Sequence, residues 1–313
     1  MNEPRPRVRH VTLQDKVAEL VPGPPPWDEF VRLGRLTKLR RLPDGRFVAV
    51  NFESGLLLYA LVKRFRPRSI LEIGTGRGFG ALCVATALRD LGGEGRIVTV
   101  DMNSYSQRID WALDDGSGPR VQPLSMKDVW EEHAEASLRA RIEPRSGPSV
   151  TVLRELRAEG FRADLVYVDG DHTYPGVRHD LYASLLVAAR PFCMLIDDYT
   201  PGSDVFGVRR LVDEDLAPVF EAEAIHTEGR WDGGALAGEP LSKSVSAQVL
   251  IDSERTRESI DSLLARAPGI VERHRRWGGV LRSWDRARRA MRRRLGGLDV
   301  RPPEGGGVPG AQC

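Results

Sequence analysis

Short apolar runs alternate with longer amphipathic segments through the middle of the chain. Four runs are apolar throughout and rich in Ile and Val, as buried strands are: residues 69–74, 96–102, 163–170 and 192–199. Segments of helical length lie between and after them, at residues 78–92, 127–142, 150–161 and 176–189. Apolar strands that each lead into a helix indicate a parallel sheet with both faces covered.

The pattern changes after a further helical segment at residues 204–217. Residues 219–227 and 244–252 alternate between polar and apolar side chains, as antiparallel strands with one wetter face do. The sequence therefore predicts an α/β fold: a doubly wound, Rossmann-like, mostly parallel sheet that ends in an antiparallel strand pair.

The two ends of the chain differ from this core, which we place at residues 51–252. Residues 1–50 are rich in Pro and Arg, and "PGPPPW" breaks any regular element there, so we expect an N-terminal extension or lid. The pattern becomes regular only from residue 51 onward. A disordered tail is expected at residues 301–313, "RPPEGGGVPGAQC".

Residues 253–300 are expected to form a C-terminal helical segment that becomes increasingly Arg-rich. An apolar stripe recurs at helical spacing opposite the arginines, formed by Trp277, Leu281, Trp284, Met291 and Leu295. We favour an exposed helix docked through this stripe. A surface for anionic membrane, and a surface for nucleic acid, remain as alternatives.

Composition narrows the class of protein. With 313 residues, 41% hydrophobic and 29% charged, the chain resembles an ordinary globular protein with one sizeable core. Its three cysteines have no metal-ligand spacing and suggest a reducing compartment. We find no apolar stretch suited to a signal peptide or a membrane span, so a cytoplasmic location is expected.

A glycine-rich turn follows the first of the four runs, in "SILEIGTGRGFG". Gly74 and Gly76 permit a tight turn and a close approach by a ligand, but Phe79 stands where the dinucleotide fingerprint has its third Gly. The next run ends in Asp101, and an acid at that point can accept hydrogen bonds from both hydroxyls of a ribose.

Two acidic clusters follow the next two runs, in "VDGDH" and "IDDY". Ligands in open parallel sheets lie at the carboxyl ends of the strands, so Asp169, Asp171, Asp197 and Asp198 should converge there. Crowded carboxylates raise each other's pKa, and a hard divalent cation such as Mg²⁺ relieves the repulsion. Roles as helix caps and turn formers are the plainer alternative, most of all for Asp171.

The stretch "LEIGTGRG" followed by "VTVDM" resembles the class I S-adenosylmethionine-dependent methyltransferases. The resemblance implies that the methionine part of the cofactor lies against Glu72, Gly74, Thr75 and Gly76. It also implies that Asp101 holds the ribose and that Met102 flanks the adenine. Many relatives have an acid before Ser149, close to the adenine; this chain has Pro148, so no adenine contact is assigned there.

The stretch "VDGDHTY" with the later "IDDY" resembles one branch of that family, the metal-dependent O-methyltransferases of sugars and other natural products. The resemblance implies that Asp169, Asp197 and Asp198 hold Mg²⁺. It leaves open whether His172 or Asp171 takes the proton of the acceptor hydroxyl. We expect His179, beside Asp180, to be a surface or capping residue.

The sequence thus favours an O-methyltransferase that uses S-adenosylmethionine, Mg²⁺ and a general base in the DGDH loop. Its acceptor would be a hydroxyl of a small molecule or sugar, of the natural-product or polysaccharide type, and a homo-oligomer remains open. One alternative is a metal-independent enzyme that uses His172 alone, and another is a cofactor-binding relative with different chemistry. The rival from another class is an RNA methyltransferase or binder that uses the basic C-terminal helix, but motifs of the Asn-Pro-Pro-Tyr type are absent.

Overall fold

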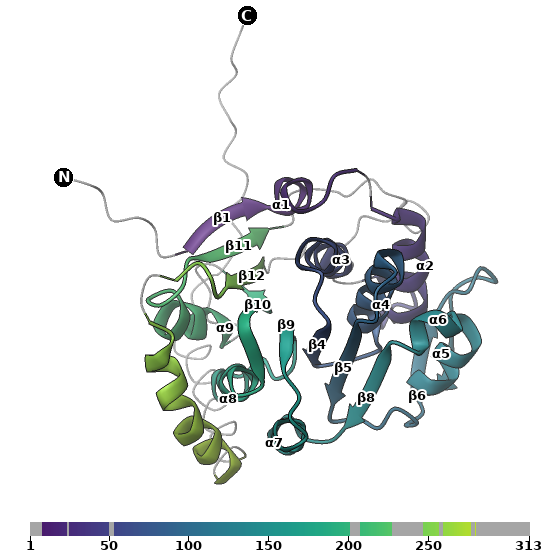
Figure 1. Cartoon of the computed structure of the whole chain (residues 1–313). Helices are drawn as coiled ribbons and strands as arrows, with labels where there is room; N and C mark the ends of the chain where they lie inside the picture. The colour runs from purple at the N-terminus through teal and green to yellow at the C-terminus, as the bar shows by residue number, and fades with distance from the viewer. Residues whose placement is uncertain are drawn as a thin grey trace, which may run out of the picture.

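The computed structural model has a central twisted sheet with helices on both faces (Figure 1). It describes residues 8–23, 25–49, 53–200, 207–226, 247–256, 259–276 and 279. The expected apolar stripe of the C-terminal helix, from Trp277 onward, and the expected tail lie outside these residues.

The sheet confirms the predicted fold class. Its eight strands lie in the order β1-β11-β12-β10-β9-β4-β5-β8. The predicted parallel strands form its centre: β4 (Ser69–Ile73), β5 (Arg96–Asp101), β9 (Ala163–Val168) and β10 (Ala188–Tyr199). β12 (Ala247–Asp252) runs antiparallel to both β10 and β11 (Ala222–His226), as the alternating pattern predicted.

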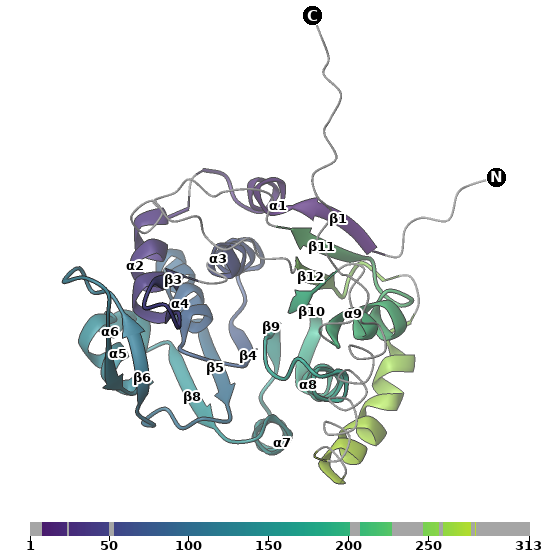
Figure 2. The same ribbon diagram turned by 180° about the vertical axis from the view of Figure 1, so that it is seen from behind.

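Helices cover the two faces of the sheet because successive strand residues point in opposite directions. Ile70 and Leu165 pack against the face covered by α1 (Leu13–Leu20), α3 (Glu53–Phe65) and α4 (Phe79–Leu91). Leu71 and Val166 pack against the face covered by α7 (Ser149–Ala158), α8 (Tyr174–Leu185) and α9 (Val208–Leu211), which continues into a π-helical turn. Figure 2 shows the same two layers from behind.

The prediction of a single helix over residues 127–142 is wrong. The segment contains α5 (Met126–His133), the short α6 (Ala136–Arg139) and the start of β8 (Ile142–Ser146). A capping box of Ser125 and Asp128 begins α5, and the extended backbone at Ala134 ends it. β8 pairs only with β5, at the sheet edge, where Pro144 is tolerated.

The first fifty residues are more regular than expected. "PGPPPW" interrupts regular structure as predicted, but a helix lies on each side of it: α1 before it and α2 (Trp27–Thr37) from its Trp onward. β1 (Val8–Thr12) extends the main sheet by pairing parallel to β11. A small hairpin, β2 (Leu39–Arg41) with β3 (Phe47–Ala49), follows α2. A second hairpin, β6 (Ile109–Leu113) with β7 (Arg120–Leu124), was likewise not predicted.

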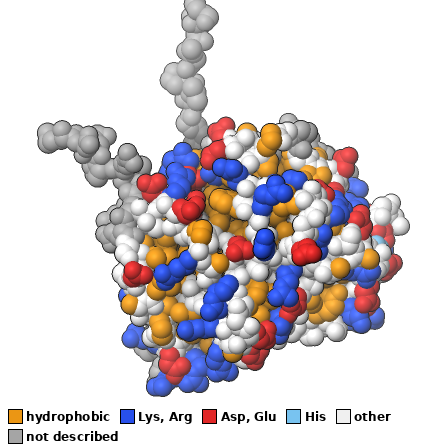
Figure 3. All heavy atoms as spheres, viewed as in Figure 1, with side chains coloured by type: hydrophobic (Ala, Val, Ile, Leu, Met, Phe, Trp, Pro, Cys, Tyr) orange, Lys and Arg blue, Asp and Glu red, His pale blue; other side chains and the backbone are white. Residues whose placement is uncertain are grey.

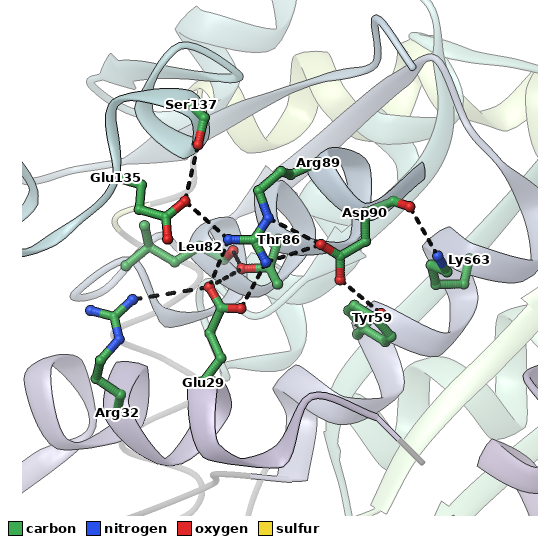
Figure 4. A network of polar contacts seen from close by, with 10 residues as sticks. All are labelled: Glu29, Arg32, Tyr59, Lys63, Leu82, Thr86, Arg89, Asp90, Glu135 and Ser137. Carbon is green, nitrogen blue, oxygen red and sulfur yellow. Dashed lines mark hydrogen bonds and ion pairs between the residues drawn. The ribbon is translucent and has the colours of Figure 1, made fainter. Parts of the chain in front are cut away.

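A polar network fixes α2 to the helices of the core (Figure 4). Arg89 of α4 donates to both carboxylate oxygens of Glu29 on α2, at 3.2 and 2.8 Å. It also pairs with Asp90 at 3.0 Å and with Glu135 at 3.1 Å. Tyr59 of α3 donates to Asp90 at 2.9 Å. The N-terminal segment is thereby tied to α3 and α4, next to the glycine loop.

A helix over residues 261–276 packs beside α8 and α9 and is drawn in yellow-green in Figures 1 and 2. Leu263 and Ala267 are fully buried in the core on the α7 and α8 side. His274 stacks on His179 with ring centroids 4.4 Å apart. The prediction that His179 is a surface residue is wrong, because only 1% of it is exposed.

Candidate active site

A cavity of about 840 Å³ lies at the carboxyl ends of the central strands. The loops after β4, β5, β8 and β9 line it, and Asp198 near the end of β10 lines it as well. Every predicted cofactor-binding and catalytic residue lines this cavity: Glu72, Gly74, Thr75, Gly76, Asp101, Met102, Asp171 and His172. Of the predicted metal ligands, Asp169 and Asp198 line it and Asp197 does not.

Gly74 brings the cofactor loop against the acidic cluster. Its φ of +93° lies in the region that favours glycine, and its N–H donates to Val100 at 2.8 Å. A Cβ at this position would lie 2.0 Å from the carbonyl oxygen of Asp169. The loops after β4 and β9 are therefore in direct backbone contact, so the two predicted sites form one.

Glu72 lies beneath the glycine loop and is only 1% exposed. Thr99 of β5 donates a short hydrogen bond to its carboxylate, and the Thr99 and Thr75 hydroxyls are hydrogen-bonded at 2.5 Å. Burial raises the pKa of Glu72 to about 8, against the opposing effect of the Thr99 bond. Glu72 thus connects the end of β4 to β5 and to the glycine loop.

Asp101 ends β5 and Met102 follows it at the cavity wall. Gly76 N–H donates to Asp101 Oδ2 and Asn103 N–H donates to Oδ1, each at 2.8 Å. These bonds hold both carboxylate oxygens in place, and each oxygen keeps further acceptor capacity. Met102 lies beside it and is 70% exposed.

Asp169, His172 and Asp198 converge, with ligand atoms within 4.8 Å of one another. His172 Nδ1 lies 2.5 Å from Asp198 Oδ2. Asp197 turns away from this group: it accepts from Tyr167 at 2.9 Å and from the Asp198 N–H at 2.8 Å. Tyr167 also donates to Asp169 at 3.2 Å and so links two of the three carboxylates.

The charges of this cluster are poorly compensated. Burial, followed by the charge of Asp197, raises the pKa of Asp169 well above its usual range. Burial and the charge of Asp198 raise the pKa of Asp197. The hydrogen bond to Asp198 raises the pKa of His172. Carboxylates that repel one another in a low-dielectric site favour a bound cation, so the donor set fits a divalent metal ion.

An irregularity in β10 presents the acidic pair to the cavity. The pairing register of β10 with β12 shifts between Ile196 and Tyr199, and Asp198 has a φ of +63°. Such bulges interrupt the ladder and re-aim side chains next to active sites. Asp198 consequently lines the cavity, whereas the carboxylate of its neighbour Asp197 accepts a hydrogen bond from Tyr167 and does not line it.

Asp171 and His172 differ in their surroundings. Thr173 N–H donates to Asp171 Oδ1 at 2.9 Å, and a Cβ on Gly176 would lie 2.2 Å from Asp171 Cγ. Asp171 therefore closes the turn that leads into α8, whose first residues are capped by Thr173. His172 instead reaches across to the carboxylate of Asp198.

Three cations that were not predicted also line the cavity: Lys38, Arg40 and Arg77. Arg40 donates to Leu39 O at 3.0 Å, and Arg77 to Leu39 O at 2.9 Å. Burial lowers the pKa of both guanidinium groups, to about 10 for Arg77, where the charge of Arg40 adds to the effect. Within the described part of the chain, none of the three forms a salt bridge. The charge of Lys38 nevertheless acts against the rise in the pKa of Glu72, Asp169 and Asp197, so this lysine lies near the acidic cluster.

Comparison with known proteins agrees with this geometry. A family described as a methyltransferase domain matches residues 71–199, which run from the glycine loop to the second acidic cluster. The chain is 28% identical over 202 residues to a catechol O-methyltransferase of Mycobacterium tuberculosis (strain ATCC 25618 / H37Rv). That match covers 61% of this chain and 80% of the relative. Residues 71–199 of the chain thus belong to a methyltransferase domain. The matched relative is named as an O-methyltransferase.

Solved structures of O-methyltransferases are similar at a greater distance. The methyltransferase TomG of Streptomyces achromogenes, solved with S-adenosylmethionine, has a TM-score of 0.49 and 22% identity, covering 75% of this chain and 92% of its own. An O-methyltransferase of Bacillus cereus, solved with S-adenosylhomocysteine, has a TM-score of 0.48 and 18% identity, covering 76% of this chain and 96% of its own. At these values the structures add nothing to the assignment.

Proposed function

We propose that this methyltransferase transfers a methyl group from S-adenosylmethionine to a hydroxyl oxygen of a small molecule, such as a sugar or another natural product. The observation that carries the proposal is the group of Asp169, His172 and Asp198. It combines a candidate base with carboxylates suited to a cation, and it lies against the glycine loop. The name of the matched relative, a catechol O-methyltransferase, supports transfer to oxygen.

Asp169 and Asp198 are the proposed ligands of a divalent cation, with Mg²⁺ the expected ion because the donors are carboxylates. Asp197, the third ligand that the resemblance implies, hydrogen-bonds to Tyr167 and does not line the cavity, so we do not place it among the ligands. When bound, such a cation lowers the pKa of a hydroxyl that it contacts, so a base of modest strength suffices. His172 is half-exposed to the cavity and hydrogen-bonded to Asp198, which orients its ring. It is therefore our candidate for accepting the hydroxyl proton.

The remaining residues bind and orient. The glycine loop and Glu72 would hold the methionine part of the cofactor, whose sulfonium group supplies an already activated methyl group. Asp101 would accept hydrogen bonds from the ribose, and Met102 would cover one face of the adenine. Alignment of acceptor oxygen, methyl carbon and sulfur is then the main task of the protein.

An RNA-directed function receives less support. On the face shown in Figure 3, basic side chains of the described residues are interspersed with acidic and apolar ones, without a continuous basic band. Nucleic-acid surfaces gather Lys and Arg on one face or along one helix.

No helix in the described part of the chain is both long and apolar enough to cross a membrane.

The test of the proposed cation is Asp169→Asn, which removes one charge and keeps the shape of the side chain. We expect wild-type turnover to be lost in EDTA and restored by Mg²⁺, and the variant to stay inactive at Mg²⁺ concentrations that saturate the wild type. S-adenosylhomocysteine affinity, measured by calorimetry, should change little. Undiminished turnover of the EDTA-treated wild type would instead leave these acids with structural roles.

A further inference from the structure

The Lys and Arg side chains that line the cavity differ in what neutralises them. Arg275 and Arg276 of the 261–276 helix both donate to Glu272, each at 2.7 Å. Lys38 and Arg40 line the same cavity, but neither forms a salt bridge with any residue that the structure describes. The cavity wall therefore holds two cations that lack a carboxylate within ion-pair distance.

Local structure turns these two cations towards the cavity. Lys38 ends α2 as its C-cap, and Arg40 lies two residues later in β2. Leu39, between them, is only 1% exposed and packs in the protein. Arg41, the next residue, is exposed and does not line the cavity. The short segment thus presents Lys38 and Arg40 to the cavity and Arg41 to solvent.

Arg77 fixes the backbone between the two cations. Its Nη1 donates to Leu39 O at 2.9 Å and its Nη2 to Asp110 O at 3.2 Å. Its guanidinium group also lies over the Trp111 ring, 5.0 Å from the centroid. The donors of Arg77 are thereby used to hold β2 against the glycine loop and β6. Arg77 is a positioning residue for its two neighbours in the cavity.

The donors of Lys38 and Arg40 are largely unused. Arg40 Nη1 donates to Leu39 O at 3.0 Å, and within the described ranges its Nε and Nη2 make no recorded hydrogen bond. An ammonium group has three donors. That of Lys38 lies 5.4 Å from the centroid of the Phe79 ring and makes no recorded hydrogen bond to a described residue. These donors remain available to a ligand in the cavity.

The two cations are also partly withdrawn from water. Burial lowers the pKa of Arg40, and burial followed by the charge of Arg40 lowers the pKa of Arg77. A desolvated charge without a counter-charge is unfavourable, so a bound anion would be stabilising. Guanidinium and ammonium groups both bind carboxylate and phosphate oxygens through charge-assisted hydrogen bonds.

Compensation of the acidic cluster is the plainer role for Lys38. Burial raises the pKa of Glu72 and of Asp169, and the charge of Lys38 opposes the rise. The pKa of Glu72 nevertheless stays at about 8. This role does not involve Arg40, which is not among the charges acting on these acids. Loss of Arg40 therefore separates the two roles.

We propose that Lys38 and Arg40 bind an anionic oxygen group, a carboxylate or a phosphate, carried by the methyl acceptor. Lys38 lies near the acidic cluster, so one small molecule can present a hydroxyl to Asp169, His172 and Asp198 and an acidic group to Lys38. The inference rests on the proposed function, since it takes the anion to be part of the acceptor. The carboxylate of the cofactor is a second source of the same chemistry, and the experiment separates the two.

The first measurement is calorimetry of inorganic phosphate with protein saturated by S-adenosylhomocysteine. No divalent cation is added, because phosphate would also bind to it. We expect the wild type to bind phosphate, and Lys38→Met and Arg40→Met each to weaken binding by about 10–100-fold, as for hydrogen bonds to a charged group. Lys38→Arg keeps the charge and should stay within a few-fold of wild type. Arg41→Met, which removes an exposed cation beside the site, is the matched control and should change nothing.

The second measurement identifies the source of the anion. S-adenosylhomocysteine has an amino-acid carboxylate, and 5′-methylthioadenosine lacks it. For an acceptor site, Lys38→Met should leave both affinities within a few-fold of wild type. A loss of tenfold or more for S-adenosylhomocysteine alone would assign the two cations to the cofactor and overturn the proposal. Mutual exclusion of phosphate and S-adenosylhomocysteine would do the same.

Two further results would contradict the inference. One is a wild type that binds phosphate no more tightly than folded Lys38→Met and Arg40→Met, which includes no binding at all. The other is an equal loss in Arg41→Met, which would show that net charge acts in place of a site. Neither result bears on methyl transfer to a hydroxyl, which the EDTA experiment and Asp169→Asn test separately.

Discussion

His172 and Asp171 are neighbours in the sequence, but the structure gives them different tasks. Asp171 accepts a backbone hydrogen bond in the turn before α8, whereas His172 contacts Asp198. We expect His172→Ala to lower the turnover number by about 10²–10⁴, the usual contribution of a general base. Affinity for S-adenosylhomocysteine should stay within a few-fold of wild type. Single-turnover kinetics and calorimetry measure the two effects separately.

Asp171→Asn is the matched control, because the amide oxygen keeps the turn while the charge is lost. Its turnover should remain near that of the wild type. A large loss of rate in Asp171→Asn, together with normal cofactor binding, would identify Asp171 as the base. Near-normal rates in both variants would show that neither side chain takes the proton.

The buried carboxyl of Glu72 should make the free energy of unfolding depend on pH. Its pKa is about 8 in the folded protein, because of burial, and about 4.3 in an unfolded chain. Between these values the unfolded chain releases a proton that the folded protein keeps, so the free energy of unfolding decreases as pH rises. The decrease from this group is on the order of 4 kcal/mol by pH 8. Glu72→Gln should remove it.

Urea unfolding of both proteins at several pH values between 5 and 8, without cofactor, measures the effect. The difference between the two stability curves isolates Glu72 from the other titrating groups. We expect the variant to gain stability relative to wild type as pH rises. Two curves that run parallel would mean that Glu72 is ionised in the folded protein throughout this range.

Some site residues follow from the sequence and others do not. Asp101, Asp169 and Asp198 could be predicted because each follows an apolar strand, and parallel strands end at one edge of a sheet. Tyr167 and Lys38 could not be predicted. Tyr167 is a buried residue within a strand, and Lys38 is distant in sequence from the other site residues, so only the packing of the fold brings each of them to the site. The signal for Tyr167 was its position two residues before Asp169, on the same face of β9.

Among the elements, those with a strong periodic pattern were predictable and those at the sheet edges were not. The central strands are apolar on both faces and so stand out. β8 contains Glu143, Pro144 and Arg145, and only its pairing with β5 makes it a strand. β1 is similar: its residues read as a basic tail until they pair with β11. Tertiary contacts outweigh local propensity at such edges.

The attachment of α2 to the core can be tested through Arg89. This side chain is 28% exposed and pairs with carboxylates from α2, α4 and the segment before α6. Arg89→Met should lower the free energy of unfolding by about 1–3 kcal/mol, since it leaves the partly buried Glu29 without its cation.

Arg120, paired with Asp115 in the loop between β6 and β7, is the control. For a pair at the surface, Arg120→Met should cost only about 0–1 kcal/mol. Equal losses in the two variants, measured by urea unfolding, would argue that the network adds no stability of its own.

The molecule as a whole is organised around one edge of its sheet. The loops after β4, β5, β8 and β9 meet there, together with the end of β10. Segments on both sides of the central strands add to the site: Lys38 from the N-terminal segment and His274 from the 261–276 helix. The edge itself belongs to any open parallel sheet. Lys38 and His274 lie outside the matched span, residues 71–199, so segments on both sides of the matched domain contribute to the wall of the cavity.

A ligand that bridges so many loops should stabilise the entire fold. At a concentration of 100 times its dissociation constant, S-adenosylhomocysteine should raise the free energy of unfolding of the wild type by about 2.7 kcal/mol. Asp101→Ala removes the acceptor expected for the ribose, which should weaken binding by about 1.5–3 kcal/mol. The same concentration should then stabilise the variant by only about 0.3–1.3 kcal/mol. Glu94→Ala, an exposed acid in the turn before β5, should retain the full effect. Equal stabilisation of all three proteins would show that Asp101 does not contact the ligand.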